Sequence, residues 1–265
     1  MVQTLDTQHS ILDLEGGWLT VWFNRPEKRN ALSNILLDEI LSALKLVEND
    51  RNVRGILFRG KGGVFCAGAD LEELKKITSS NNDSKATALN MSTKIGKVFD
   101  QIRKAPQITV SAIEGAGMAG AFGVACASDI LVSMSDARFA LTETKLGLTP
   151  AQIAPHVIAR LGFTQARKLM LLGGVFDGQK AFEMGMADYL AKTESELNRL
   201  IQDIQEQVRN CSPNAIATTK KLIAEVYPTI DIKRAASLFS ECVVSEDGQE
   251  GLSSFFEKRK PFWVI

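Results

Sequence analysis

Residues 108–134 read ITVSAIEGAGMAGAFGVACASDILVSM, and this stretch decides the fold that the sequence predicts. Its two ends, 108–113 and 129–134, are short and largely apolar, as buried strands are. Between them, residues 118–127 are mostly small and predict a closely packed helix. A strand, a helix and a second strand in this order are typical of a parallel sheet with crossover helices. The sequence therefore predicts an α/β fold.

The alternation of strands and helices continues on both sides of this stretch. Residues 11–23 predict a hairpin around Gly16 and Gly17, and Ser33 or Asn34 can cap the helix that follows. We expect strands at 55–59 and 187–190, a strand-to-loop passage at 64–70, and a polar surface loop at 78–85. We expect helices at 33–47, 71–77, 86–104, 153–161, 165–172, 178–184, 194–208, 213–226 and 232–244. A boundary near residue 195 would separate a core of residues 1–195 from a helical region of residues 196–265.

The composition excludes several classes of protein. The 265 residues hold 31 lysines and arginines against 31 aspartates and glutamates, so bulk charge favours neither nucleic acid nor a membrane as a partner. The four cysteines form no C-x-x-C pair, which argues against a zinc site or a disulfide framework. No basic segment leads into an apolar run at the start, and residues 115–128 are too few to span a bilayer. We therefore expect a cytoplasmic globular protein with reduced thiols and no metal.

The segment 115–120, GAGMAG, has three interpretations. It satisfies G-x-G-x-x-G between a predicted strand and a predicted helix, and Asp136 lies at the distance expected for a residue that binds ribose, as in a dinucleotide fingerprint. The glycines can also simply let a helix pack closely on a sheet. In the third interpretation the helix N-terminus stabilises an oxyanion, with a second N–H donor from the loop 65–71, FCAGADL.

Three motifs in a fixed order resemble the crotonase, or enoyl-CoA hydratase/isomerase, superfamily. They are RPEKRNAL at 25–32, VFCAGADL at 64–71 and the segment 112–130, and the ending EKRKPFW at 257–263 agrees with them. The resemblance implies an α/β spiral of repeated strand-strand-helix units with a helical C-terminal region that packs in trimers, often paired as hexamers. It also implies that the N–H groups of Ala69 and Gly120 form an oxyanion hole for the thioester of an acyl-coenzyme A substrate. Three linked motifs outweigh the single glycine motif.

The acid–base chemistry that the resemblance implies depends on Glu143. Hydratases of this superfamily typically use two glutamates; the second falls on Glu143, whereas Gly123 stands at the position of the first. Glu143 follows the end of a short apolar strand, so burial would raise its pKa toward that of a general acid or base. Without the resemblance, a surface ion pair with Lys145 or Arg138 would be the ordinary expectation. A glycine at position 123 would leave room for a bulkier or acidic acyl chain.

A closer resemblance concerns the substrate. Residues 142–155, TETKLGLTPAQIAP, together with Phe122 and Gly123, are similar to bacterial hydratases of methylglutaconyl-CoA and isohexenylglutaconyl-CoA. This similarity implies hydration of a branched 2-enoyl-CoA, with coenzyme A arriving as part of the substrate and no permanently bound cofactor. Two alternatives remain: a double-bond isomerase that uses Glu143 alone, and a dinucleotide-binding module built on residues 115–120.

Coenzyme A carries several phosphate charges, so a neutral protein must concentrate cations at the mouth of the site. The resemblance assigns this role to Lys28 and Arg29. The residues expected to line the adenine and pantetheine path are Ala31, Ala67, Ala69, Asp70 and Leu71. Lys258 and Lys260 are weaker candidates that could reach across a subunit boundary.

Gln152 and His156 follow the Glu143 segment and are four residues apart. Either could orient water or meet a distal carboxylate of the substrate. The more ordinary expectation is a helix-capping glutamine and a partly buried histidine with satisfied hydrogen bonds. We therefore do not predict a catalytic role for either.

Overall fold

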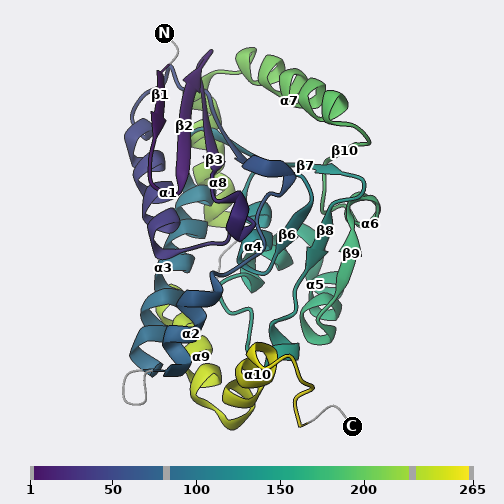
Figure 1. Cartoon of the computed structure of the whole chain (residues 1–265). Helices are drawn as coiled ribbons and strands as arrows, with labels where there is room; N and C mark the ends of the chain where they lie inside the picture. Colours follow the sequence, from purple (N-terminus) through teal and green to yellow (C-terminus); the bar gives the residue numbers. More distant parts are fainter. Residues whose placement is uncertain (1–2, 80–83, 227–230, 263–265) are drawn as a thin grey trace.

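A mixed sheet of seven strands forms the centre of the molecule in the computed structural model, which describes residues 3–79, 84–226 and 231–262 (Figure 1). The strand order is β1-β2-β3-β4-β5-β7-β10, antiparallel from β1 to β3 and parallel from β3 to β10. The bounds are Gln3–Asp6 (β1), Ser10–Glu15 (β2), Trp18–Phe23 (β3), Gly55–Gly60 (β4), Ile108–Ile113 (β5), Ile130–Met134 (β7) and Tyr189–Ala191 (β10). Because β5 and β7 pair in parallel, the predicted strand, crossover helix and strand are confirmed.

Ten α-helices lie within the described residues and cover this sheet or extend from it. They are Asn34–Val47 (α1), Leu71–Ser79 (α2), Ser84–Lys104 (α3), Gly120–Ala127 (α4), Ala154–Leu172 (α5), Gly178–Glu183 (α6), Glu194–Arg209 (α7), Pro213–Val226 (α8), Ile232–Val244 (α9) and Glu246–Phe256 (α10). The Ser33 side chain caps α1 by accepting a hydrogen bond from the N–H of Leu36. Within the described ranges, none of these helices combines the length and the apolar character of a membrane-spanning segment.

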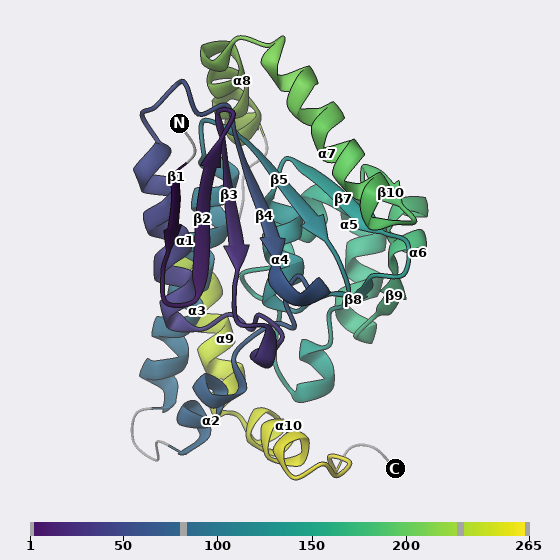
Figure 2. The same cartoon turned by 45° about the horizontal axis from the view of Figure 1, so that its top comes forward.

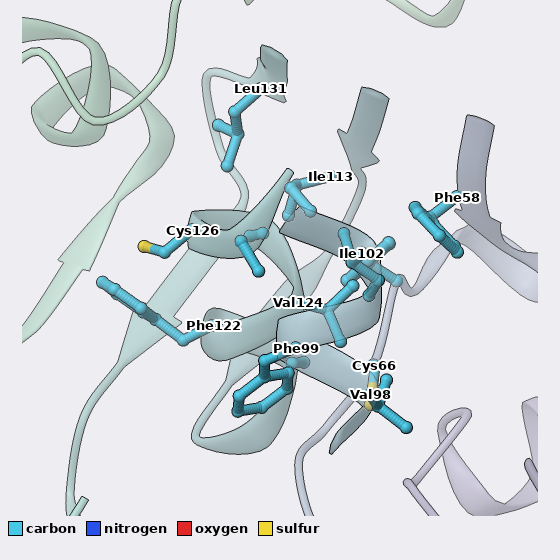
Figure 3. Packing of buried hydrophobic residues seen from close by; sticks show 14 of the residues in the cluster. Phe58, Cys66, Val98, Phe99, Ile102, Ile113, Phe122, Val124, Cys126 and Leu131 are labelled. Atoms are coloured by element: carbon cyan, nitrogen blue, oxygen red, sulfur yellow. The ribbon is translucent and has the colours of Figure 1, made fainter. Parts of the chain in front are cut away.

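Helix α4 lies inside the protein rather than on its surface. All eight of its residues are buried, which only a segment of small and apolar side chains tolerates. Figure 3 shows Phe122, Val124 and Cys126 of α4 in the same apolar cluster as Phe99 of α3. This burial fixes the position of the first turn of α4, where the glycine segment ends.

A second, three-stranded sheet carries the residues that precede and follow α4. Its order is β6-β8-β9, with bounds Ala116–Met118, Arg138–Ala140 and Val175–Asp177. Phe139 of β8 stacks on Phe176 of β9 with 5.6 Å between ring centroids, and it meets Phe122 of α4 edge to face at 6.0 Å. These aromatic contacts hold β8. The chain leaves β8 only three residues before Glu143.

The C-terminal helices pack on opposite ends of the core. Helix α7 buries Leu197, Ile201 and Ile204 against the sheet at β5 and β7. Helix α9 runs along α3, and α10 contacts α2, so that these helices meet at the end of the molecule far from the N-terminus (Figures 1 and 2). The division into residues 1–195 and 196–265 stays a prediction.

The structure differs from the sequence prediction at several elements. Strands β1, β6 and β9 and helix α10 were not predicted, and these strands are too short to show a period. The short apolar strand predicted before Glu143 is β8. The predicted strand-to-loop passage at 64–70 is a loop without a strand, because this segment pairs only at Cys66 and Ala69 as isolated bridges. Segments 153–161 and 165–172 belong to one helix, α5, which is interrupted at Gly162 (φ 70°). In the predicted loop 78–85, residues 80–83 lie outside the described residues, and its flanks continue α2 and α3.

Candidate active site

A cavity of about 430 Å³ opens beside the N-terminus of α4. Its walls come from α2, α3, the loop before α4, the turn Glu143–Leu146, residues 148–153 and the C-terminal helices α9 and α10. No Lys, Arg or His side chain lines it among the described residues. The polar side chains in its lining are Ser92, Thr142, Glu143, Thr149 and Gln152. A largely apolar cavity with a few polar groups has the form of a small-molecule site.

Two loops meet at this cavity because their backbones pair. The N–H of Cys66 donates to the carbonyl of Ala116 (2.8 Å), and the N–H of Met118 donates to the carbonyl of Cys66 (3.1 Å). Gly68, at φ 100°, then passes so close that a Cβ there would lie 3.1 Å from the Met118 carbonyl oxygen. The glycine at position 68 therefore lets the two loops run side by side.

Ala69 and Gly120 follow these paired segments, and both line the cavity. The N–H of Gly120 begins α4, and neither its N–H nor that of Ala69 donates to another backbone group among the described residues. Ala119 precedes α4 with φ 48°, a strained conformation of a kind that clusters at functional sites. Free N–H groups at the positive end of a buried helix can stabilise negative charge on a bound oxygen.

Charged and amide groups of residues 25–30 fix the loop that carries Ala69. The Arg25 guanidinium pairs with the Asp70 carboxylate at 2.8 Å, and both side chains are largely buried. Burial alone would raise the pKa of Asp70, but the hydrogen bonds from Arg25 and from the N–H of Glu72 bring it below its ordinary value. Asn30, fully buried, donates to the carbonyl of Val64 and accepts from the N–H of Arg25. These contacts fix the loop relative to the residues 25–30.

Glu143 begins the turn that follows β8, and it is 9% exposed. Its Oε2 is buried and has no hydrogen-bond partner among the described residues. Burial raises the pKa of Glu143 to about 7, opposed only by a hydrogen bond from its own N–H. Among the described residues, neither Lys145 nor Arg138 forms an ion pair with Glu143, and the Lys145 side chain lies beside Gly173. A carboxyl group in this state can exchange protons near neutral pH.

Gly123 lies within α4, and Phe99 of α3 occupies the space beside it. A Cβ at position 123 would lie 2.3 Å from the Phe99 ring, and neither residue lines the cavity. Figure 3 shows this ring beside the ribbon of α4. The expectation that Gly123 leaves room for a bulkier acyl chain is therefore wrong, because core packing uses that room. Among the described residues, Glu143 is the one carboxylate in the cavity lining.

The structure brings together only part of the predicted coenzyme A path. Ala67, Ala69 and Leu71 line the cavity, with Leu71 half exposed at its edge. Asp70 and Ala31 are buried and do not line it. The predicted cations are exposed and stand outside the lining: Lys28, Arg29, Lys258 and Lys260. The Lys28 ammonium pairs with the Glu72 carboxylate at 2.7 Å, and this hydrogen bond raises the pKa of Lys28.

Gln152 and His156 face different surroundings. Gln152 lies in the turn before α5 and lines the cavity. The expected helix-capping role of Gln152 is wrong, because α5 has no side-chain capping hydrogen bond at its N-terminus. His156 is 7% exposed and packs edge to face on Phe99, with 5.6 Å between ring centroids. Burial lowers the pKa of His156 to about 4, so its ring is neutral at physiological pH. The histidine is buried in the core, and the expectation that its hydrogen bonds are satisfied stays a prediction.

Sequence reasoning missed the wall that the C-terminal helices supply. Phe239 of α9 and Leu252 and Phe255 of α10 line the cavity about a hundred residues after Glu143 in the chain. Ser92 of α3 lines it as well, with 2% exposure. No local pattern marks these residues, because only the packing of α9 along α3 brings them to the site.

The chain belongs to the enoyl-CoA hydratase/isomerase family, whose model matches residues 13–264. The methylglutaconyl-CoA hydratase of mouse mitochondria is 31% identical over 92% of this chain and 79% of its own length. Among solved structures, AtuE of Pseudomonas aeruginosa has a TM-score of 0.79 at 37% identity and covers 97% of this chain and 100% of its own. An enoyl-CoA hydratase/isomerase of Marinobacter aquaeolei has a TM-score of 0.78 at 35% identity, covering 96% and 98%. The predicted crotonase fold is confirmed, and these relatives support enoyl-CoA hydratase activity on an acyl-CoA thioester.

The geometry also shows why the glycine segment is not a dinucleotide fingerprint. Residues Ala116–Met118 form strand β6 within the motif, whereas a phosphate-binding fingerprint needs a tight turn from strand to helix there. Asp136 is exposed and does not line the cavity that Gly120 lines. The glycines serve close packing and the entry into α4.

Proposed function

We propose that this protein is a hydratase that adds water across the 2,3 double bond of an enoyl-CoA thioester, with Glu143 as its acid–base group. The observation that carries the proposal is the buried carboxyl of Glu143, with a free Oε2 and a pKa raised to about 7. It lines the same cavity as Ala69 and Gly120, whose N–H groups are free to bind the thioester oxygen. Acid–base and oxyanion-binding groups are thus available in one largely apolar cavity.

In the proposed reaction, the N–H groups of Ala69 and Gly120 donate to the thioester oxygen. The ionised Glu143 takes a proton from water while the water oxygen bonds to C3, and the electron pair of the double bond moves onto the thioester oxygen as an enolate. Two preorganised donors stabilise this charge. The protonated Glu143 then returns its proton to C2 as the thioester carbonyl reforms. One water is added and the carboxylate is regenerated, so a single glutamate suffices for the proton balance.

The acyl chain in this proposal is branched and of the glutaconyl type, as in 3-methylglutaconyl-CoA. The similarity to a methylglutaconyl-CoA hydratase supports it. The cavity of about 430 Å³ has space for a branch at C3 and apolar walls to receive it. We further propose that the enzyme acts in branched-chain acyl-CoA metabolism in the cytoplasm, and that coenzyme A enters only as part of the substrate.

A double-bond isomerase is the second candidate, because one carboxylate lines the cavity among the described residues. The same Glu143 would take a proton from C2 of a 3-enoyl-CoA, giving a dienolate, and return it to C4, with no water added. The two reactions use the same oxyanion donors. They differ in whether oxygen from water enters the product.

For the nucleotide end of the substrate, we propose that Lys28 and Arg29 contact the phosphates, with Lys28 exchanging Glu72 for phosphate. We also propose a homotrimer, or a hexamer of two trimers. Five large apolar side chains on three consecutive elements, α5, β9 and α6, are exposed and support an interface between copies. They are Phe163, Leu171, Leu172, Val175 and Phe182.

The proposal is tested with a panel of thioesters: crotonyl-CoA, 3-methylcrotonyl-CoA, 3-methylglutaconyl-CoA and a 3-enoyl-CoA. Hydration removes the absorbance of the conjugated thioester, and mass spectrometry in water labelled with oxygen-18 counts the oxygen incorporated. Labelled product from a 2-enoyl-CoA supports the hydratase. A folded protein that only converts the 3-enoyl-CoA, without label, would establish the isomerase instead.

A further inference from the structure

Ser92 and Gln152 form a buried polar pair in the wall of the cavity. Ser92 is 2% exposed and Gln152 is 8% exposed, and both line the cavity. The side chains near Ser92 on α3, Met91 and Ile95, are apolar, as is Phe239 of α9. Polar groups in an apolar wall cost free energy unless they find partners. The pair therefore has either a structural partner or a ligand to bind.

Gln152 is held in a single orientation by two helices. Its Nε2 donates to the carbonyl of Ile232 at the start of α9 (3.1 Å) and to the Oγ of Ser92 (3.2 Å). A carbonyl oxygen only accepts, so the nitrogen of the amide must face Ile232. The glycine at position 96 of α3 leaves space for the Gln152 amide oxygen, because a Cβ at this position would lie 2.3 Å from the Gln152 Oε1. The amide is thus fixed, and it presents a donor to Ser92.

The Ser92 hydroxyl is left with a hydrogen to donate. Its oxygen accepts from Gln152, and no described residue accepts from it in return. A hydroxyl inside a helix commonly donates to the carbonyl four residues earlier. The neighbouring Thr93 does so, to Leu89 at 2.7 Å. Ser92 therefore offers a free O–H donor to whatever occupies the cavity.

The position of Ser92 along α3 indicates which part of a substrate it meets. Phe99 of α3 packs against Gly123 in the first turn of α4. Ser92 lies about two turns earlier, roughly 10 Å away along the helix axis. The thioester oxygen would bind at the start of α4. Ser92 lines the cavity together with Gln152, which follows the Glu143 turn, so we assign Ser92 to the acyl chain.

We propose that Ser92, oriented by Gln152, is the specificity residue that selects acyl chains whose far end carries a hydrogen-bond acceptor, such as the carboxylate of a glutaconyl thioester. This inference rests on the proposed hydratase function and specifies its substrate class. Hydrogen bonds from uncharged donors stabilise an ionised carboxylate, so the absence of a cation from the described lining does not oppose it.

The test compares two thioesters of equal shape. In 3-methylglutaconyl-CoA the chain ends in a carboxylate, and in 3,5-dimethylhex-2-enoyl-CoA an isopropyl group replaces it. Ser92→Ala should lower kcat/KM for the first substrate roughly 10- to 100-fold, mainly through KM, because a hydrogen bond to a charged group is lost. The second substrate should change by less than about twofold. Thr93→Ala is the matched control, since its hydroxyl already donates to Leu89, and it should alter neither substrate.

Gln152→Met provides a second variant, in which the hydroxyl of Ser92 loses the hydrogen bond that orients it. It should lower the ratio of kcat/KM for 3-methylglutaconyl-CoA to kcat/KM for the isopropyl substrate, as Ser92→Ala does. Thermal unfolding of each variant checks that the fold is retained. Equal losses for both substrates, or a ratio that Ser92→Ala leaves unchanged, would overturn the role of Ser92. If the wild-type protein hydrates crotonyl-CoA but prefers the isopropyl substrate, the inference fails while the hydratase function stands. If it hydrates no thioester, the proposed function itself fails.

Discussion

At the scale of single residues, the state of Glu143 decides what the cavity can do. A buried carboxyl with an unpaired oxygen lowers the stability of a folded protein, so its presence points to a functional role. Ser92 and Gln152 show the opposite case, in which a polar group is buried with its orientation fixed by partners. The same wall thus holds one group suited to moving a proton and another suited to donating a hydrogen bond.

Glu143→Gln should lower kcat roughly 10²- to 10⁴-fold, because an amide cannot take a proton from water. KM should change little, since the side chain keeps its shape and its place in the wall. The measurement is the decay of thioester absorbance under saturating substrate, with thermal unfolding as the control for the fold. Hydration at the wild-type rate would remove Glu143 from the mechanism.

The wild-type kcat/KM should rise with pH and level off above about 7. The pKa of Glu143 is raised from 4.5 to about 7, so below that pH the carboxyl is protonated and cannot act as a base. A pantetheine thioester without nucleotide phosphates should show the same rise, because the titrating group belongs to the protein. A flat profile between pH 6 and pH 8 would mean that the acting base has an ordinary carboxyl pKa.

At the scale of elements, the site depends on two loops that pair across Cys66 and Gly117. Gly68→Ala should lower kcat roughly 100-fold, because an added methyl group would press on Met118 and move the Ala69 N–H from its place. Gly63→Ala is the matched control. Gly63 also has a positive φ, of 72°, but open space lies around its missing side chain. Both variants should unfold at lower temperature, and an equal effect on kcat would show that backbone strain alone is responsible.

Elements differed in how well the sequence predicted them, and the difference has a physical cause. Helices α1 and α7 carry a capping residue and an apolar stripe within their own residues, so the pattern alone predicted them. Strands β6 and β8 have three residues each and exist because they pair with one another. Residues 64–70 contain the right residues for the site, but the strand expected at the start of this strand-to-loop passage does not form.

At the scale of the whole molecule, the exposed apolar side chains of α5, β9 and α6 form the surface at which we propose self-association. Leu172 is 67% exposed at the end of α5, close in sequence to the exposed Leu171 and Val175. Leu172→Glu should shift the protein from trimer or hexamer toward monomer, because a charge cannot be buried there without a partner. Leu46→Glu on α1 is the matched control, with 68% exposure and no proposed role. Sedimentation velocity measures both, and a wild-type monomer would contradict the proposed assembly.

The sequence by itself determined the family, the two loops that carry Ala69 and Gly120, and Glu143 as the candidate acid–base residue. These are properties of continuous motifs, so reading along the chain suffices to find them. Only the tertiary structure decided that Glu143 is buried with a pKa near 7, that Phe99 fills the space at Gly123, and that Ser92 meets Gln152. Each of these depends on contacts between residues far apart in the chain. Burial and the orientation of a hydrogen bond arise from such contacts, and no local period or spacing encodes them.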